Sequence, residues 1–154
     1  MEEISRRIGF IPFVYGDADA SAIAQKTLEL FKNKTINEIF VTSKYGIWKI
    51  FQDEGVPFEK LVVTSREGEN EPMQELFAFL KKTNSGKLVS VHIIATHYCC
   101  PRFAAQICRL GKQYKQELDL MVGGCKPVYP KRDTGYCLGL LLEPFRILED
   151  VFVS

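Results

Sequence analysis

The chain has 154 residues, of which 46% are hydrophobic and 25% are charged, values typical of one globular domain rather than of a disordered or fibrous chain. Its net charge of +1 disfavours a non-specific nucleic-acid binder, because such proteins take most of their affinity from neutralising phosphates. The sequence shows no secretory signal and no apolar run near the roughly 18 residues that span a bilayer, and its five unevenly spaced cysteines are typical of reduced thiols, so we expect a cytoplasmic protein without a membrane segment.

The first half of the chain alternates short apolar runs with helical patterns. Asp17 or Asp19 is placed to cap the first helix, and Gly55 is placed to end the second. The runs are rich in Ile, Val and Phe, which favours strands. We expect strands over 6–16, 37–43 and 59–65, with helices over 17–33 and 44–57.

The second half continues the alternation. The helix expected over 69–86 has acidic residues and Pro72 at its start and lysines near its end, which suits the helix dipole. A strand over 87–96, a helix over 101–116 and a strand over 117–124 follow. A turn-rich stretch (125–135) and an apolar stretch (136–154) complete the chain, and the latter either closes the sheet or packs on a partner.

Repeated strand–helix alternation with continuously apolar strands predicts a mainly parallel sheet of about five strands, with helices on both faces, in a single α/β domain over 1–154. In such sheets ligands bind beyond the C-terminal ends of the strands, where the loops lead into helices. The residues at those ends are therefore the candidates for function.

Three of the expected strands end in hydroxyl residues, in the runs VTS (41–43), VTS (63–65) and AT (95–96). A hydroxyl at such a joint either caps the next helix or binds a phosphate or ribose beside free backbone N–H groups. Capping alone explains each site separately. The ligand-binding candidates from these runs are Thr42, Ser43, Thr64 and Thr96.

The joint after the fourth expected strand reads THYCCPR (96–102) and offers two kinds of chemistry. Cys99 or Cys100 before a helix could form a reactive thiolate, with His97 nearby, although buried cysteines also pack simply as small apolar groups. Histidines and cysteines here lack the spacing of a zinc site, so we expect no metal. Arg102 would lie in the first turn of the helix, where a cation opposes the dipole, and could clamp a phosphate or carboxylate; a surface arginine is the alternative.

Two further joints carry candidates. Gly16 ends the first expected strand and Asp17 follows it, without the GxGxxG pattern of a dinucleotide site. Glu69 and Asn70 begin the third expected helix, where a carboxylate either stabilises the helix or binds a ligand hydroxyl.

The order of the segments ASAIAQKTLELFKNKTINEIFVTS, DEGVP, ENEPMQELFAFL and ATHYCCPRFAAQICRLG resembles the YdcF/SanA/ElyC-like family of α/β proteins, over most of residues 20–111. The resemblance implies a three-layer Rossmann-like fold and an association with envelope processes, and it suggests S-adenosylmethionine as a ligand, which at least one soluble member is described as binding. Glu69, Asn70, Tyr98 and Arg102 match the family's E-N pair and the tyrosine and arginine of its strand-to-helix joint. Cys99 stands where that joint has histidine, and TSK (42–44) stands for SGG.

Taken together, these patterns favour a small-molecule site for an anionic or nucleotide-like ligand at the C-terminal edge of the sheet. S-adenosylmethionine as the ligand would allow a transferase reaction, although no residue identifies itself as the base. A thiol-dependent enzyme using Cys99 or Cys100 and a non-catalytic interaction module are the alternatives.

Overall fold

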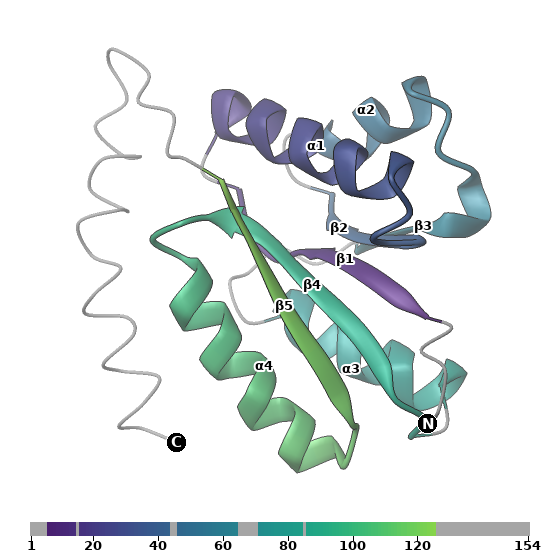
Figure 1. The fold of residues 1–154 in the computed structure, drawn as a ribbon, viewed down its shortest axis with the longest axis vertical. Helices are drawn as coiled ribbons and strands as arrows, with labels where there is room; N and C mark the ends of the chain where they lie inside the picture. The colour runs from purple at the N-terminus through teal and green to yellow at the C-terminus, as the bar shows by residue number, and fades with distance from the viewer. Residues whose placement is uncertain (1–5, 15, 44–45, 65–70, 85, 126–154) are drawn as a thin grey trace.

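The computed structural model describes residues 6–14, 16–43, 46–64, 71–84 and 86–125. They form one sheet of five strands in the order β3-β2-β1-β4-β5, and every neighbouring pair is parallel. Two helices cover each face (Figure 1), which confirms the three-layer α/β fold expected from the alternation. The strands are β1 (Arg7–Ile11), β2 (Glu38–Thr42), β3 (Leu61–Thr64), β4 (Val89–Thr96) and β5 (Leu118–Cys125).

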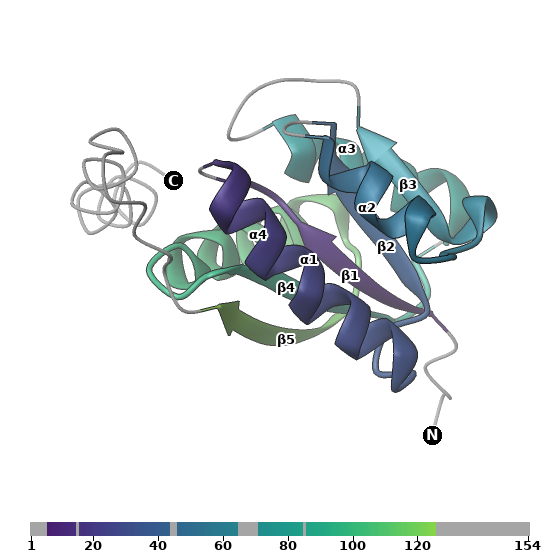
Figure 2. The same ribbon diagram turned by 90° about the horizontal axis from the view of Figure 1, so that it is seen from above.

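The four helices connect the strands in turn and fall into two layers. Figure 1 and Figure 2 show α1 and α2 on one face of the sheet and α3 and α4 on the other. This division follows from the strand order, because the chain builds outward from β1 to β3 and then crosses to the far side of β1 for β4. The helices are α1 (Asp17–Lys32), α2 (Ile47–Asp53), α3 (Glu71–Thr83) and α4 (Cys100–Tyr114), with a 3₁₀ turn, η2 (Phe58–Lys60), before β3.

Each face of the sheet has its own apolar core. The α3/α4 side buries Phe10 and Phe40 of the strands against Phe77 and Phe103 of the helices. The α1/α2 side buries a second set, in which Ile39 and Ile94 are fully enclosed. All eight residues of β4 are buried, as its β-branched composition requires of a strand covered on both faces.

The observed elements are shorter than expected at several ends. The first strand stops at Ile11 because Pro12 has no N–H to donate to the ladder. The second helix covers only Ile47–Asp53 of the expected 44–57. Gly55, just beyond its capping residue Glu54, has a positive φ of 87°, the conformation for which glycine is favoured at a helix end.

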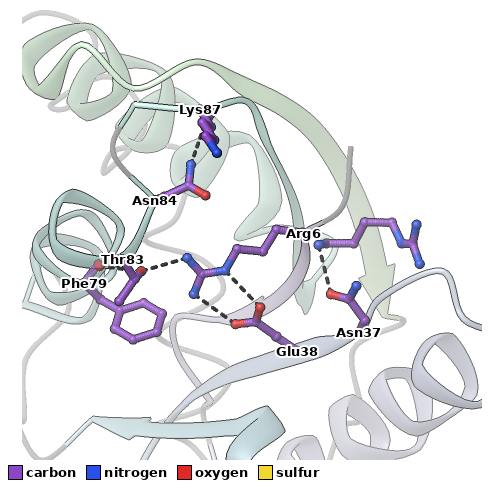
Figure 3. A network of polar contacts seen from close by, with 8 residues as sticks. Arg6, Asn37, Glu38, Phe79, Thr83, Asn84 and Lys87 are labelled. Atoms are coloured by element: carbon purple, nitrogen blue, oxygen red, sulfur yellow. Dashed lines mark hydrogen bonds and ion pairs between the residues drawn. The ribbon is translucent and has the colours of Figure 1, made fainter. Parts of the chain in front are cut away.

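A polar network fastens the N-terminal edge of the sheet (Figure 3). Arg6 forms a two-pronged ion pair with Glu38, with N–O distances of 2.9 and 3.0 Å, and its Nη1 donates a hydrogen bond of 2.7 Å to Thr83 Oγ1. The guanidinium also lies 4.9 Å from the centre of the Phe79 ring. These contacts join the start of β2 to the end of α3, so they belong to the scaffold.

Within the described ranges, no helix combines the length and apolarity needed to cross a bilayer. The apolar stretch 136–154, for which sheet closure or a partner contact was considered, lies outside the residues that the structure describes.

Candidate functional site

The strand order places a topological switch point between β1 and β4. The chain leaves β1 toward α1 on one face and leaves β4 toward α4 on the other, so the two loops diverge beyond the sheet. Open α/β sheets bind their ligands in the crevice outside such a point. The joint over 96–102, together with Gly16 and the start of α1, therefore flanks the position at which this fold most often carries function.

The start of α1 differs from the expectation in its capping. Gly16 is the N-cap residue, its carbonyl accepts the first helical hydrogen bond from Ala20, and no side chain caps the helix. Asp17 and Asp19 are instead helical residues of the first turn, so the prediction that one of them is the N-cap is wrong. Asp17 is exposed and Asp19 is buried, and both carboxylates complement the dipole.

Thr42, Ser43 and Thr96 do not cap the helices that follow them. The N-cap of α2 is Gly46 and that of α4 is Cys99, neither with a side-chain cap, so capping explains neither the Thr42–Ser43 pair nor Thr96. Thr42 and Thr64 are register partners on adjacent strands, and Ser43 N donates a hydrogen bond of 3.1 Å to the Thr64 carbonyl. Strand ends thus bring Thr42, Ser43 and Thr64 together at the β2–β3 side of the edge.

Thr64 has an unusual environment for a hydroxyl. It is 2% exposed, and its Oγ1 finds no hydrogen-bond partner among the residues that the structure describes. Thr96 lies at the end of β4, three strand spacings away across the sheet, or about 14 Å. The candidates therefore form two groups along one edge, with the loop after β1 between them.

Arg102 occupies the first turn of α4 and is only 2% exposed. Its guanidinium carbon lies 4.5 Å from the centre of the neighbouring Phe103 ring. A surface position, the alternative considered for this side chain, is therefore wrong. Burial encloses a permanent cation in the first turn of a helix, next to the switch point.

The thiols of the joint are buried as well. Cys99 Sγ donates to Thr96 Oγ1 at 3.7 Å, and Cys100 Sγ lies 3.5 Å from the Thr96 carbonyl oxygen. Burial raises the pKa of Cys100 to about 11, although a hydrogen bond to Ala95 O acts in the opposite direction. A thiol with such a pKa is protonated at neutral pH, which disfavours the thiolate chemistry considered for Cys100.

His97 and Tyr98 are exposed residues of the same joint, as is Pro101. A methyl group added at Gly124 would meet His97 Nδ1, so the imidazole lies directly against the end of β5. His92 is buried on the α1 side of β4, away from this loop. In the part of the chain that the structure describes, no three His, Cys, Asp or Glu side chains gather closely enough to hold a metal ion.

The last two candidates, Glu69 and Asn70, lie outside the described residues, so their predicted role stays a prediction.

Cavities lined by lysines and Tyr114 lie at the opposite edge of the sheet, around the ends of α3 and α4. Lys81 is expected from the sequence to complement the dipole of its helix, but only the tertiary structure brings it together with Lys112 and Lys115.

No protein-family model matches the chain, and neither a curated protein nor a solved structure matches it. The resemblance to the YdcF/SanA/ElyC-like family therefore has no support from these comparisons and stays a prediction. What is shown is the architecture: a doubly wound parallel sheet whose switch point carries a buried arginine.

Proposed function

We propose that this domain binds an anionic, nucleotide-like small molecule beyond the C-terminal ends of β1 and β4. The observation that carries the proposal is the burial of Arg102 in the first turn of α4, beside the switch point. The helix dipole disfavours a cation at that place, so helix stability does not explain it. A guanidinium suits a phosphate or carboxylate, which it can bind through two parallel hydrogen bonds.

The second group of hydroxyls supports an elongated ligand. Thr42, Ser43 and Thr64 lie at the same edge but on the far side of β1 from Arg102. A lone phosphate at Arg102 would not reach them, whereas a ligand with a sugar or base attached would extend along the edge toward them. S-adenosylmethionine, whose carboxylate and ribose would suit the two groups, belongs in the set of ligands to be tested, alongside nucleotides and sugar phosphates.

Thermal stabilisation of the purified protein by these compounds tests the proposal. A ligand that binds only the folded state raises the unfolding temperature in proportion to RT ln(1 + [L]/Kd). We expect at least one compound to stabilise the wild-type chain, Arg102→Ala to lose most of that shift, and Arg102→Lys to lose part of it because a lysine has no planar fork.

Arg109 provides the matched control, because it is an exposed arginine on the same helix. Arg109→Ala should retain the full ligand-induced shift. If Arg102→Ala destabilises the free protein, the comparison between Arg102→Lys and Arg109→Lys still isolates the guanidinium. Equal shifts in the Arg102 and Arg109 variants, or no shift with any compound, would contradict the proposal.

A further inference from the structure

The C-terminal ends of α3 and α4 lie at the opposite end of the sheet from the candidate site (Figure 1). Three adjoining cavities are lined by residues at and near these helix ends. Their volumes are about 370, 280 and 210 Å³. They share walls: Gln116 lines the largest and the smallest, Lys115 lines the two larger ones, and Tyr114 lines the two smaller ones. Together they are large enough for a small ligand.

The charge around these cavities is predominantly positive. Lys81, Lys112 and Lys115 line them and are exposed, and among the lining residues described here Glu117 is the single carboxylate. A chain of net charge +1 has no general excess of lysine that would produce such a gathering by itself. The helix dipoles account for Lys81 and Lys112, which lie in or near the last turns of α3 and α4.

Lys115 is not explained by the helix dipole alone. It is the C-cap of α4 and has a φ of 54°, in the left-handed region that favours glycine. A lysine there costs free energy that glycine would avoid. The Lys115 side chain lines two of the cavities, however, where its ammonium group can contact a ligand. Lys34, which follows α1, has a similar φ of 63° but lines none of these three cavities, so it offers a comparison.

Tyr114 gives the cavities a rigid wall. Its ring stacks on the buried ring of Phe77, with centroids 5.5 Å apart and planes inclined by 26°, while 38% of the residue remains exposed. Gln116, which lines two of the cavities, is fixed in place because its Nε2 donates hydrogen bonds to the carbonyl oxygens of Lys87 and Glu117. A fixed hollow with lysines at its rim suits a compact anion better than an extended polymer.

We infer that these cavities form a second ligand site, which binds a compact compound with several phosphate groups. Lys81, Lys112 and Lys115 contact the phosphate oxygens, and the Tyr114 ring forms the wall against which the ligand rests. Exposed ammonium groups are screened by salt, so the affinity falls as ionic strength rises. This site is separate from the Arg102 site and does not depend on it.

Titration of the ¹⁵N-labelled chain with inorganic tripolyphosphate, followed by amide chemical shifts, tests the inference. We expect saturable shifts at Lys81, Gly86 and 112–118, and a weaker response to orthophosphate, which carries less charge. Shifts at 97–103 would report the Arg102 site instead, so the two sites are read separately in one spectrum. Shifts absent from 112–118, or growing without saturation, would overturn the inference.

Matched charge-removing variants locate the lysines. The double variant Lys112→Gln/Lys115→Gln should weaken binding at 112–118 on the order of tenfold, because each exposed ion pair contributes up to about 1 kcal/mol. Lys34→Gln/Lys60→Gln removes the same charge from exposed positions outside these cavities and should leave the affinity unchanged. Equal affinities in the two double variants would show that general charge, and not this site, holds the anion.

Discussion

At the scale of single residues, the candidate site depends on two side chains whose burial the sequence did not indicate. The sequence places Arg102 in a helix turn where a cation is unfavourable, but it does not distinguish a ligand-binding arginine from a surface one. The structure shows that the side chain is buried. Thr64 ends its strand in the same VTS pattern as Thr42, yet its Oγ1 is the one for which no hydrogen-bond partner is found among the described residues. A buried hydroxyl of that kind costs free energy in the absence of a ligand.

Thr64→Val therefore gives a prediction in which stability and binding move in opposite directions. Valine keeps the branched shape and removes the hydroxyl, so the free protein should gain roughly 0.5–2 kcal/mol in free energy of unfolding, measured by urea denaturation. The thermal shift produced by a ligand of the Arg102 site should become smaller. Val63→Thr, on the exposed neighbour, should change neither. A loss of stability in Thr64→Val would mean that the hydroxyl already has a stabilising partner.

At the scale of elements, β4 and β5 fit together through glycines. A methyl group at Gly123 would approach His92 Nε2 to 2.7 Å, so the imidazole on the α1 side of β4 uses the space that a side chain on β5 would occupy. His92 is 7% exposed, and its Nδ1 has no hydrogen-bond partner within the described ranges. The space beside Gly123 is therefore filled by a histidine side chain of the neighbouring strand.

Gly123→Ala should therefore destabilise the fold. The buried ring of His92 would have to move, at a cost of roughly 1–3 kcal/mol in free energy of unfolding by urea denaturation. Val122→Ala, on the exposed neighbour in the same strand, is the control and should cost far less. In the background His92→Ala the effect of Gly123→Ala should largely disappear, and an undiminished effect there would place the cause elsewhere.

Element types were predictable, whereas their ends were less so. Apolar periodicity identified the five strands and four helices. A strand that is buried on both faces has a continuous apolar run, whereas a helix that is buried on one face has apolar residues at every third or fourth position. The ends depend on single residues: Pro12 stops β1, and Gly46 rather than a hydroxyl caps α2. Such ends are decided by backbone geometry, which periodicity does not record.

At the scale of the whole molecule, the sequence predicted parallel pairing but not the order of the strands. Alternation of strands and helices requires crossover connections, and these permit several orders. The order β3-β2-β1-β4-β5 decides which loops meet, because it makes β1 and β4 neighbours although 77 residues (12–88) lie between Ile11 and Val89 along the chain. The same order places Thr64 and Thr96 three strands apart, so the hydroxyl residues lie along one edge of the sheet and do not share a single pocket.

The buried ionisable groups of the sheet predict how the stability of the whole fold depends on pH. Burial, aided by Lys26, lowers the pKa of His92 below 6.5, so the unfolded chain binds this proton more readily and stability falls as the pH drops below about 6.5. Burial raises the pKa values of Cys100 and Cys125 from 9.0 to about 11, and Asp19 contributes to the second. Their contribution is fully present below pH 9 and is lost as the pH rises from 9 to 11.

Urea denaturation across this range should thus show a plateau between about pH 6.5 and 9 and a decline on each side. Near pH 10.5 each thiol should account for a loss of roughly 2 kcal/mol. Lysines and tyrosines also titrate there, so the informative comparison is with Cys100→Ala/Cys125→Ala, whose alkaline decline should be shallower. His92→Gln should likewise flatten the acid side while leaving the alkaline side as in the wild type. Identical curves for the wild-type chain and the double cysteine variant would mean that these thiols ionise as readily in the folded sheet as in the unfolded chain.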